Sequence, residues 1–296
     1  KLLIFNNVEG VHVDSLALMG GRDSKYGSAA FIRESSPEFN DVKFTGNTSE
    51  KGGAIFIMEG SPEFTDTKFT NNTATDRGGG MYVNSASPVI RRTVIADNTV
   101  DSENNNMYGG GIYSYNSSLT LENDTLLSNF AGGFESKGGG IYIDSDITRD
   151  SLDVYIIQDL VLSGNQADHG AGIYIKNAEA EIRRCQITGN VGENGAAMYY
   201  VNAKVRVINS TISGNTTENE NAPGGIYCRD GAKGLFLLNT IVWNNTYPQM
   251  LFDQNQTQLI VAHSDIGHPD YTNDGLGYYS NVNINPGLDG SFLETN

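Results

Sequence analysis

Short apolar segments with a period-two alternation recur along the chain and are separated by Gly, Asn and Ser-Pro every 8–12 residues. One complete unit consists of segments 52–57 (GGAIFI), 61–64 (SPEF) and 69–72 (FTNN), and variants of it return up to about residue 245. Segments this short, with this period, are typical of strands and exclude helices. The pattern predicts an all-β protein with three short strands in each unit.

An asparagine closes each unit and fixes the period. The closing residues are Asn47, Asn72, Asn98, Asn129, Asn165, Asn190, Asn215 and Asn245, at spacings of roughly 25–36 residues. Apolar residues stand eight and three positions before each of them, as Phe64 and Phe69 do before Asn72. Such columns indicate stacked units that bury their apolar faces against their neighbours. We therefore predict a single-stranded parallel β-helix of about ten coils over residues 1–270, stacked about 4.8 Å apart. The segment 271–296 reads as an irregular cap or the start of a further module.

The repeated tetrapeptides resemble those of a known family. Segments 44–47 (FTGN), 52–55 (GGAI) and 69–72 (FTNN) are similar to the paired repeats of chlamydial polymorphic outer membrane proteins. They also resemble the wider set of bacterial right-handed parallel β-helix surface proteins, and the resemblance covers about residues 11–250. It implies a right-handed β-helix that acts as an adhesin or secreted passenger at the cell surface. Kinship with carbohydrate-active β-helices is a weaker implication.

The asparagine column allows two structural interpretations. In one, the side chains point inward and each amide bonds to the next along the axis. In the other, each asparagine sits at a corner in the left-handed backbone region, which asparagine tolerates.

An aromatic column precedes the asparagines, by 16 residues in six of eight coils. Its members are Phe31, Phe56, Tyr82, Tyr113, Tyr142, Tyr174, Tyr199 and Tyr227. The flanking positions are mostly aliphatic, so strand alternation places the aliphatic side chains inside and the aromatic rings outside. Exposed rings would stack sugars or a partner, which makes the six residues from Tyr82 to Tyr227 candidate ligand-binding residues. Alternatively, the rings stack on one another and serve the fold alone.

Charge narrows the range of partners. The chain carries 19 basic and 35 acidic residues, a net charge of -16, which argues against nucleic acid and anionic membranes. No apolar run is long enough for membrane insertion in this fragment. Residue 1 already lies in strand-like sequence, so we interpret the chain as a mature or excised piece of a longer protein. Cys185 and Cys228 fall in inward columns two coils apart, and we expect two buried free thiols.

A carboxylate column lies three residues after the asparagines and includes Asp168, Glu193 and Glu218 in consecutive coils. Stacked carboxylates repel one another unless a cation bridges them, and oxygen ligands suit Ca²⁺. We hypothesise a weak calcium site at these three residues. The alternative is that they are solvated acidic turns.

Coil length varies mainly at one place, between the asparagine and the next aromatic residue. The insertions are 101–108, 131–137 and 217–223, and one more, 145–152, lies between strands within its coil. Insertions that gather at one corner of a solenoid often mark a binding edge.

Catalytic chemistry has a weaker basis in this sequence. A polysaccharide lyase would use Lys137, Asp168 and His169, which lie in corner turns of successive coils, although histidine in such turns is usually a turn residue. A glycosidase would need two carboxylates across a groove, and Asp144 and Asp146 share one strand face.

The first functional expectation is a secreted or cell-surface stalk or adhesin without catalytic activity. It would bind a glycan or a host or cell-surface protein along one edge. The second is a carbohydrate-active enzyme, either a lyase or a glycosidase. The third is a structural protein that self-associates into filaments through its coil ends or its aromatic face.

Overall fold

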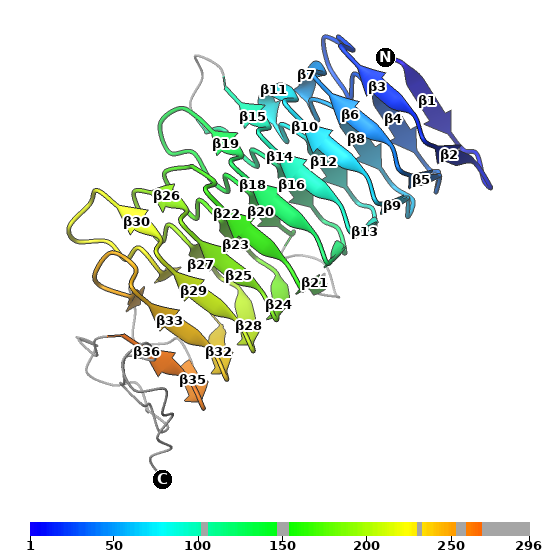
Figure 1. Ribbon diagram of the computed structural model, residues 1–296. Helices are drawn as coiled ribbons and strands as arrows, with labels where there is room; N and C mark the ends of the chain where they lie inside the picture. Colours follow the sequence, from blue (N-terminus) through cyan, green and yellow to red (C-terminus); the bar gives the residue numbers. More distant parts are fainter. Residues whose placement is uncertain (102–105, 147–153, 230–232, 253–258, 268–296) are drawn as a thin grey trace.

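The protein is an elongated stack of coils made only of strands in its described part. The computed structural model describes residues 1–101, 106–146, 154–229, 233–252 and 259–267. These residues form 36 strands and no helix, and every strand pairing is parallel between successive coils (Figure 1). The prediction of an all-β solenoid is confirmed.

Three long sheets run the length of the stack, and a discontinuous set of short strands lies at one corner. Sheet A contains β1 (Leu3–Asn6), β4 (Ala30–Arg33), β8 (Ile55–Met58), β12 (Met81–Asn84), β16 (Ile112–Tyr115), β20 (Ile141–Asp144), β23 (Ile173–Lys176), β27 (Met198–Val201), β31 (Ile226–Arg229) and β34 (Met250–Phe252). Sheet B contains β2 (His12–Asp14), β5 (Glu38–Asn40), β9 (Glu63–Thr65), β13 (Val89–Arg91), β17 (Thr120–Glu122), β21 (Val154–Gln158), β24 (Glu179–Arg183), β28 (Lys204–Ile208), β32 (Gly234–Leu238) and β35 (Leu259–Ala262). Sheet C contains β3 (Ala17–Met19), β6 (Lys43–Thr45), β10 (Lys68–Thr70), β14 (Val94–Ala96), β18 (Thr125–Leu127), β22 (Val161–Ser163), β25 (Gln186–Thr188), β29 (Thr211–Ser213), β33 (Ile241–Trp243) and β36 (Asp265–Ile266). The corner between sheets C and A holds β7 (Thr48–Lys51), β11 (Thr73–Arg77), β15 (Thr99–Val100), β19 (Phe130–Ala131), β26 (Val191–Gly192) and β30 (Thr216–Thr217).

Each coil adds one strand to each long sheet, which agrees with the expected number of about ten coils. The register follows the sequence columns, since Phe56 pairs with Tyr82, and Phe44 with Phe69. The described strands end at Ile266, and the predicted cap, 271–296, lies outside the described residues.

Stacked rings and aliphatic side chains fill the interior. Phe39 stacks on Phe64 with centroids 5.0 Å apart, and Phe44 on Phe69 at 4.6 Å. Later coils place Ile, Leu and Val in the same inward positions, all buried. A thin solenoid core is stable because each coil buries its apolar residues against both neighbours.

The asparagines form an internal ladder. Each Nδ2 donates to Oδ1 of the asparagine in the next coil at 2.8–3.0 Å, from Asn47 to Asn245, where Gln249 Oε1 is the last acceptor. The same Oδ1 also accepts the backbone N–H of the previous asparagine, and Nδ2 donates a second bond to a backbone carbonyl, as Asn72 does to Phe44. The left-handed residue is instead the one before, such as Asn71 at φ 56° or Gly46 at φ 64°. The inward interpretation is therefore confirmed, and the corner interpretation is wrong for the ladder residues.

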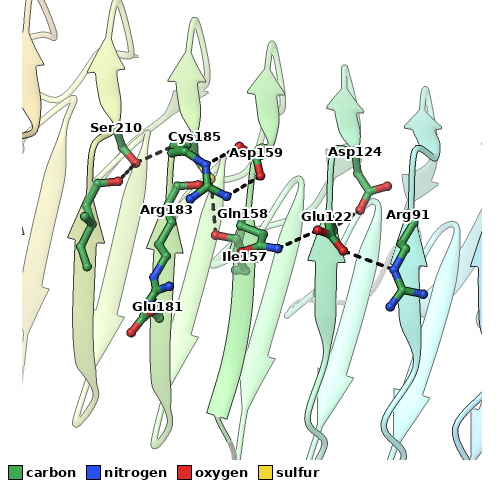
Figure 2. Close-up of polar contacts among 12 residues, drawn as sticks. Arg91, Glu122, Asp124, Ile157, Gln158, Asp159, Glu181, Arg183, Cys185 and Ser210 are labelled. Atoms are coloured by element: carbon green, nitrogen blue, oxygen red, sulfur yellow. Dashed lines mark hydrogen bonds and ion pairs between the residues drawn. The ribbon is translucent and has the colours of Figure 1, made fainter.

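A second buried polar column stands five residues before the ladder and includes Thr93, Asp124, Cys185 and Ser210. Ser210 Oγ accepts from the Cys185 backbone N–H at 3.0 Å, as Figure 2 shows. Asp124 accepts the Thr93 backbone N–H at 2.7 Å and the Glu122 backbone N–H at 2.9 Å. Burial raises the pKa of Asp124 to about 7, although the two hydrogen bonds act in the opposite direction and lower the pKa. Both cysteines are free and buried, as expected.

The outer face of sheet B carries ion pairs that run from coil to coil. Arg91 contacts Glu63 and Glu122, and Glu122 in turn accepts from Gln158 Nε2 (Figure 2). Arg92–Asp66 and Arg184–Asp159 are bidentate pairs at the turn that follows. In these places, a carboxylate that faces solvent has a cation in an adjacent coil.

Candidate binding groove

The aromatic column lies on the outer face of sheet A, as the alternation predicts, because it forms an apolar cluster separate from the core. Its rings are not free, however. From Tyr82 to Tyr174 they stack face to face at 4.7–5.2 Å, and the side chains from Phe56 to Tyr199 are only 3–8% exposed. Tyr227 closes the row edge-on against Tyr199 at 5.0 Å. The expectation that these tyrosines offer ring faces to a sugar is not supported for Tyr82, Tyr113, Tyr142, Tyr174 and Tyr199, because neighbouring rings occupy those faces. For Tyr227, which is half-buried, it stays a prediction.

A further column, five residues before each ring, covers the aromatic row. Its members are Tyr26, Lys51, Arg77, Tyr108, Lys137, His169 and Asn194. Arg77 lies over the rings of Tyr108 and Tyr113, and Lys137 lies over those of Tyr108 and Tyr174, all at 5.3–5.9 Å. These cation–π contacts join the two columns into one layer. The constant five-residue offset between this column and the rings is visible in the sequence, but the column was not identified from the sequence alone.

Burial changes the titration of this layer. It raises the pKa of Tyr113, Tyr142 and Tyr174, since each phenolate would lie in an apolar stack. Burial also lowers the pKa of Lys137, with the like charges of Lys176 and Arg229 acting in the same direction.

The structure separates the three residues proposed for lyase chemistry. Lys137 and His169 lie in register on successive coils and pack against tyrosine rings. Both nitrogens of His169 are engaged, Nε2 with Glu135 at 3.0 Å and Nδ1 with Asn194 at 3.2 Å. Asp168 lines a groove at the corner instead, and its Oδ2 accepts the Ser136 backbone N–H at 3.2 Å. Consecutive residues of an extended chain point to opposite sides, so these groups do not form one acid–base set.

The carboxylate pair proposed for glycosidase chemistry is also restrained. Asp144 accepts from the Tyr142 hydroxyl at 3.2 Å and Lys176 Nζ at 3.3 Å, and from Asn177 at 3.0 Å. The Asp146 backbone N–H donates to Asn116. Asp144 thus serves to join neighbouring coils on sheet A.

Two described turns at the corner between sheets C and A contain insertions relative to the regular coils. Residues 132–140 join β19 to β20, and residues 218–225 join β30 to β31. Figure 1 shows both turns projecting from the same edge of the stack, with β26 between them. Insertion 101–108 is only partly described, and most of 145–152 lies outside the described residues.

A groove of about 590 Å³ lies between these two turns. Two regular coils supply its floor, and the residues there are Gln166, Ala167, Asp168, Val191, Gly192 and Glu193. Phe130, Gly132, Gly133 and Ser136 line one wall, and Glu218 and Asn219 line the other. The side chains of Phe130 and Val191 are partly exposed there, and Phe134 at the tip of the first turn is 68% exposed. The groove therefore combines apolar patches with carboxylates.

Asp168, Glu193 and Glu218 all line this groove, but their side chains are not grouped as metal ligands in this structure. Across the described ranges, no three His, Cys, Asp or Glu side chains are grouped closely enough to hold a metal ion. Asp168 is held by Ser136, which donates to its carboxylate and accepts from its backbone N–H at 2.9 Å. The calcium hypothesis stays a prediction that this geometry does not support.

The wall turn 132–140 is fixed from below. Glu135 reaches down to His169 Nε2 at 3.0 Å, and this contact is the main reason that the pKa of Glu135 is lowered. The Ser136 and Lys137 backbone N–H groups are bonded to Asp168 and Met107. One wall of the groove is thus held in place by His169 and Asp168, which the sequence suggested as catalytic candidates.

The described part of the chain has no apolar helix of membrane-spanning length. Comparison with curated proteins and with solved structures found no significant match. The family described as right handed beta helix region matches residues 6–148 and 140–285, which together span most of the chain. The matched stretches coincide with the stacked coils and confirm the predicted handedness. The chain therefore belongs to the right-handed β-helix family.

Proposed function

We propose that this protein is a secreted or cell-surface β-helix that acts as a stalk or adhesin without catalytic activity. Its ligand, a glycan or a protein of another cell surface, binds in the groove at the corner between sheets C and A. The observation that carries the proposal is the groove itself, a hollow of about 590 Å³ between two long turns on a regular scaffold. Binding sites are concentrated in such turns because a solenoid holds them rigidly while their length varies.

The composition of the groove supports binding over a purely structural role. Phe130 and Val191 provide apolar contact area, while Asp168, Glu193, Glu218 and Asn219 provide hydrogen-bonding groups. A concave surface with apolar contacts and a few directed polar groups is typical of ligand sites.

The state of the catalytic candidates favours binding over turnover. A lyase base must reach a substrate proton, whereas Lys137 is half-buried over two tyrosine rings and His169 is bonded at both nitrogens. Both residues face the aromatic layer, away from the groove that Asp168 lines.

A groove-filling substitution tests the proposal. Gln166 lies on the groove floor directly after ladder residue Asn165, and Thr48 holds the equivalent position after Asn47, in a coil far from the groove. We expect Gln166→Trp to abolish binding to the ligand found in a screen of surface glycans and cell-surface proteins. Thr48→Trp is the matched control and should bind like the wild type. Equal binding by all three proteins would refute the groove as the site.

A further inference from the structure

We infer that the corner groove takes a positively charged side chain, a lysine or arginine on an extended segment of a partner protein. This inference rests on the proposed function and names the ligand class for the same groove. Three features of the groove carry it: the sign of its charge, the lack of internal ion pairs, and the apolar surface beside the carboxylates.

The charge of the groove has one sign. Asp168, Glu193 and Glu218 line it in three consecutive coils, and no lysine, arginine or histidine is among its lining residues. Successive coils are about 4.8 Å apart, so like charges stacked this way make the electrostatic potential in the groove more negative, which attracts a cation. An anionic polymer such as a polyuronate would be repelled from the same place.

The groove carboxylates also differ from most of those on the outer face of sheet B. On sheet B and its turn, Glu122, Asp66 and Asp159 are paired with arginines of neighbouring coils. In the described part of the chain, neither Glu193 nor Glu218 has an ion pair. The fold thus pairs these acidic residues of sheet B and its turn with arginines, whereas Glu193 and Glu218 have no such partner among the described residues. In the groove, a ligand's cation would supply the missing charge.

The shape favours an organic cation over a metal ion. The described carboxylates are not grouped closely enough to be shared metal ligands. A guanidinium or ammonium group carries several donors and can contact carboxylates that are farther apart than those of a metal site. Its aliphatic stem would pack on Ala131, Ala167 and Val191, and its charged end would also lie near the Phe130 ring.

The test uses a five-residue peptide with two arginines separated by glycine, and the same peptide with citrulline, which keeps the shape and removes the charge. At pH 7.5 and low salt we expect the arginine peptide to bind at least tenfold more tightly than the citrulline peptide. Asp168→Asn/Glu193→Gln/Glu218→Gln should weaken that binding at least tenfold.

The matched control removes the same three charges from exposed positions in the first coils. Glu9→Gln/Asp14→Asn/Glu59→Gln should bind the arginine peptide within twofold of the wild type. Equal weakening in both triple variants, or equal affinity for the citrulline peptide, would overturn the inference. Groove-dependent binding of a glucosamine oligomer, with no binding of the arginine peptide, would overturn the partner class but leave the groove as the ligand site. A surface ligand found by screening that Gln166→Trp still binds would overturn the proposed function as well.

Discussion

At the residue scale, the sequence columns locate the asparagine ladder but leave its inward direction open, and they predict exposure poorly. Asn72 and its equivalents were identified by spacing alone, since a constant period is visible in the chain. The burial of Tyr142 was not predicted. Tyr108 stacks on its ring and Lys137 lies over Tyr108, and both residues come from a column of mixed residue types. Such a column can be recognised by its constant spacing but not by a shared residue type.

Asp124 gives a prediction about pH. Its folded pKa is raised to about 7, so the unfolded chain ionises first as pH rises from about 4. Its contribution to stability is therefore greatest at low pH, falls between about pH 4 and 7, and stays unfavourable above 7. Asp124→Thr restores the hydroxyl found at Thr93 and Thr240, and should raise the Tm by several degrees at pH 8.

Thermal unfolding from pH 4 to 8 checks this prediction. The difference in Tm between Asp124→Thr and wild type should shrink toward pH 4, because the folded carboxyl is then protonated and the unfolded carboxyl, with its ordinary pKa of 3.8, is only partly ionised. Glu9→Gln, an exposed carboxylate, is the control and should leave the pH profile unchanged. A constant difference across the pH range would contradict the account.

Asn129 tests the ladder. Asn129→Ala leaves the backbone N–H and the Nδ2 of Asn98 without their acceptor in a buried site. We expect a loss of about 3 kcal/mol in unfolding free energy, because each buried unsatisfied donor costs about 1–3 kcal/mol. Asn40→Ala, on an exposed position of β5, should change stability little. Denaturant unfolding followed by circular dichroism measures both.

At the element scale, the sequence located the insertions that flank the groove but not the groove itself. Insertions 131–137 and 217–223 were visible as breaks in the period, and the structure places both at one corner with two regular coils between them. The groove could not be predicted, because its floor depends on which way Asp168 and His169 point. Strand alternation near a bend is ambiguous from sequence, and for that reason the sequence did not show that Asp168 lines the groove while Lys137 and His169 pack on the tyrosine rings.

The turn 132–140 should depend on its contact with His169. Glu135→Gln weakens the ion pair, and faster amide hydrogen exchange is expected at residues 132–136, with the global Tm nearly unchanged because Glu135 is half-exposed. The wild-type turn should loosen in the same way as pH falls through the lowered pKa of Glu135, since the carboxylate contributes only while ionised. Glu193→Gln, on the groove floor, is the control. Unchanged exchange in Glu135→Gln would show that the backbone bonds suffice.

At the scale of the whole molecule, fold and family follow from the period, while the proposed function rests on one local departure from it. The three long sheets and the ladder were predictable because each coil repeats the same apolar and asparagine positions. The ligand was not predictable, because the groove lies where inserted residues interrupt the repeat. The charge of the groove has the same sign as that of the whole chain, which carries a net charge of -16.

Calcium provides a test at this scale. The described carboxylates form no ligand group, so we expect calorimetric titration to show no calcium binding tighter than millimolar. Chelator should then leave the Tm unchanged. Micromolar binding that is lost in Asp168→Asn would restore the calcium hypothesis and weaken the case for an organic cation.

The central claim is that this β-helix binds its ligand without altering it. The most direct measurement is size-exclusion chromatography of the protein mixed with acidic, neutral and amine-bearing polysaccharides and with surface proteins. We predict co-elution with a neutral or cationic ligand, loss of co-elution in Gln166→Trp, and no change in polymer length after long incubation. Shortening of any polymer by the wild-type protein would contradict the account and identify the protein as an enzyme.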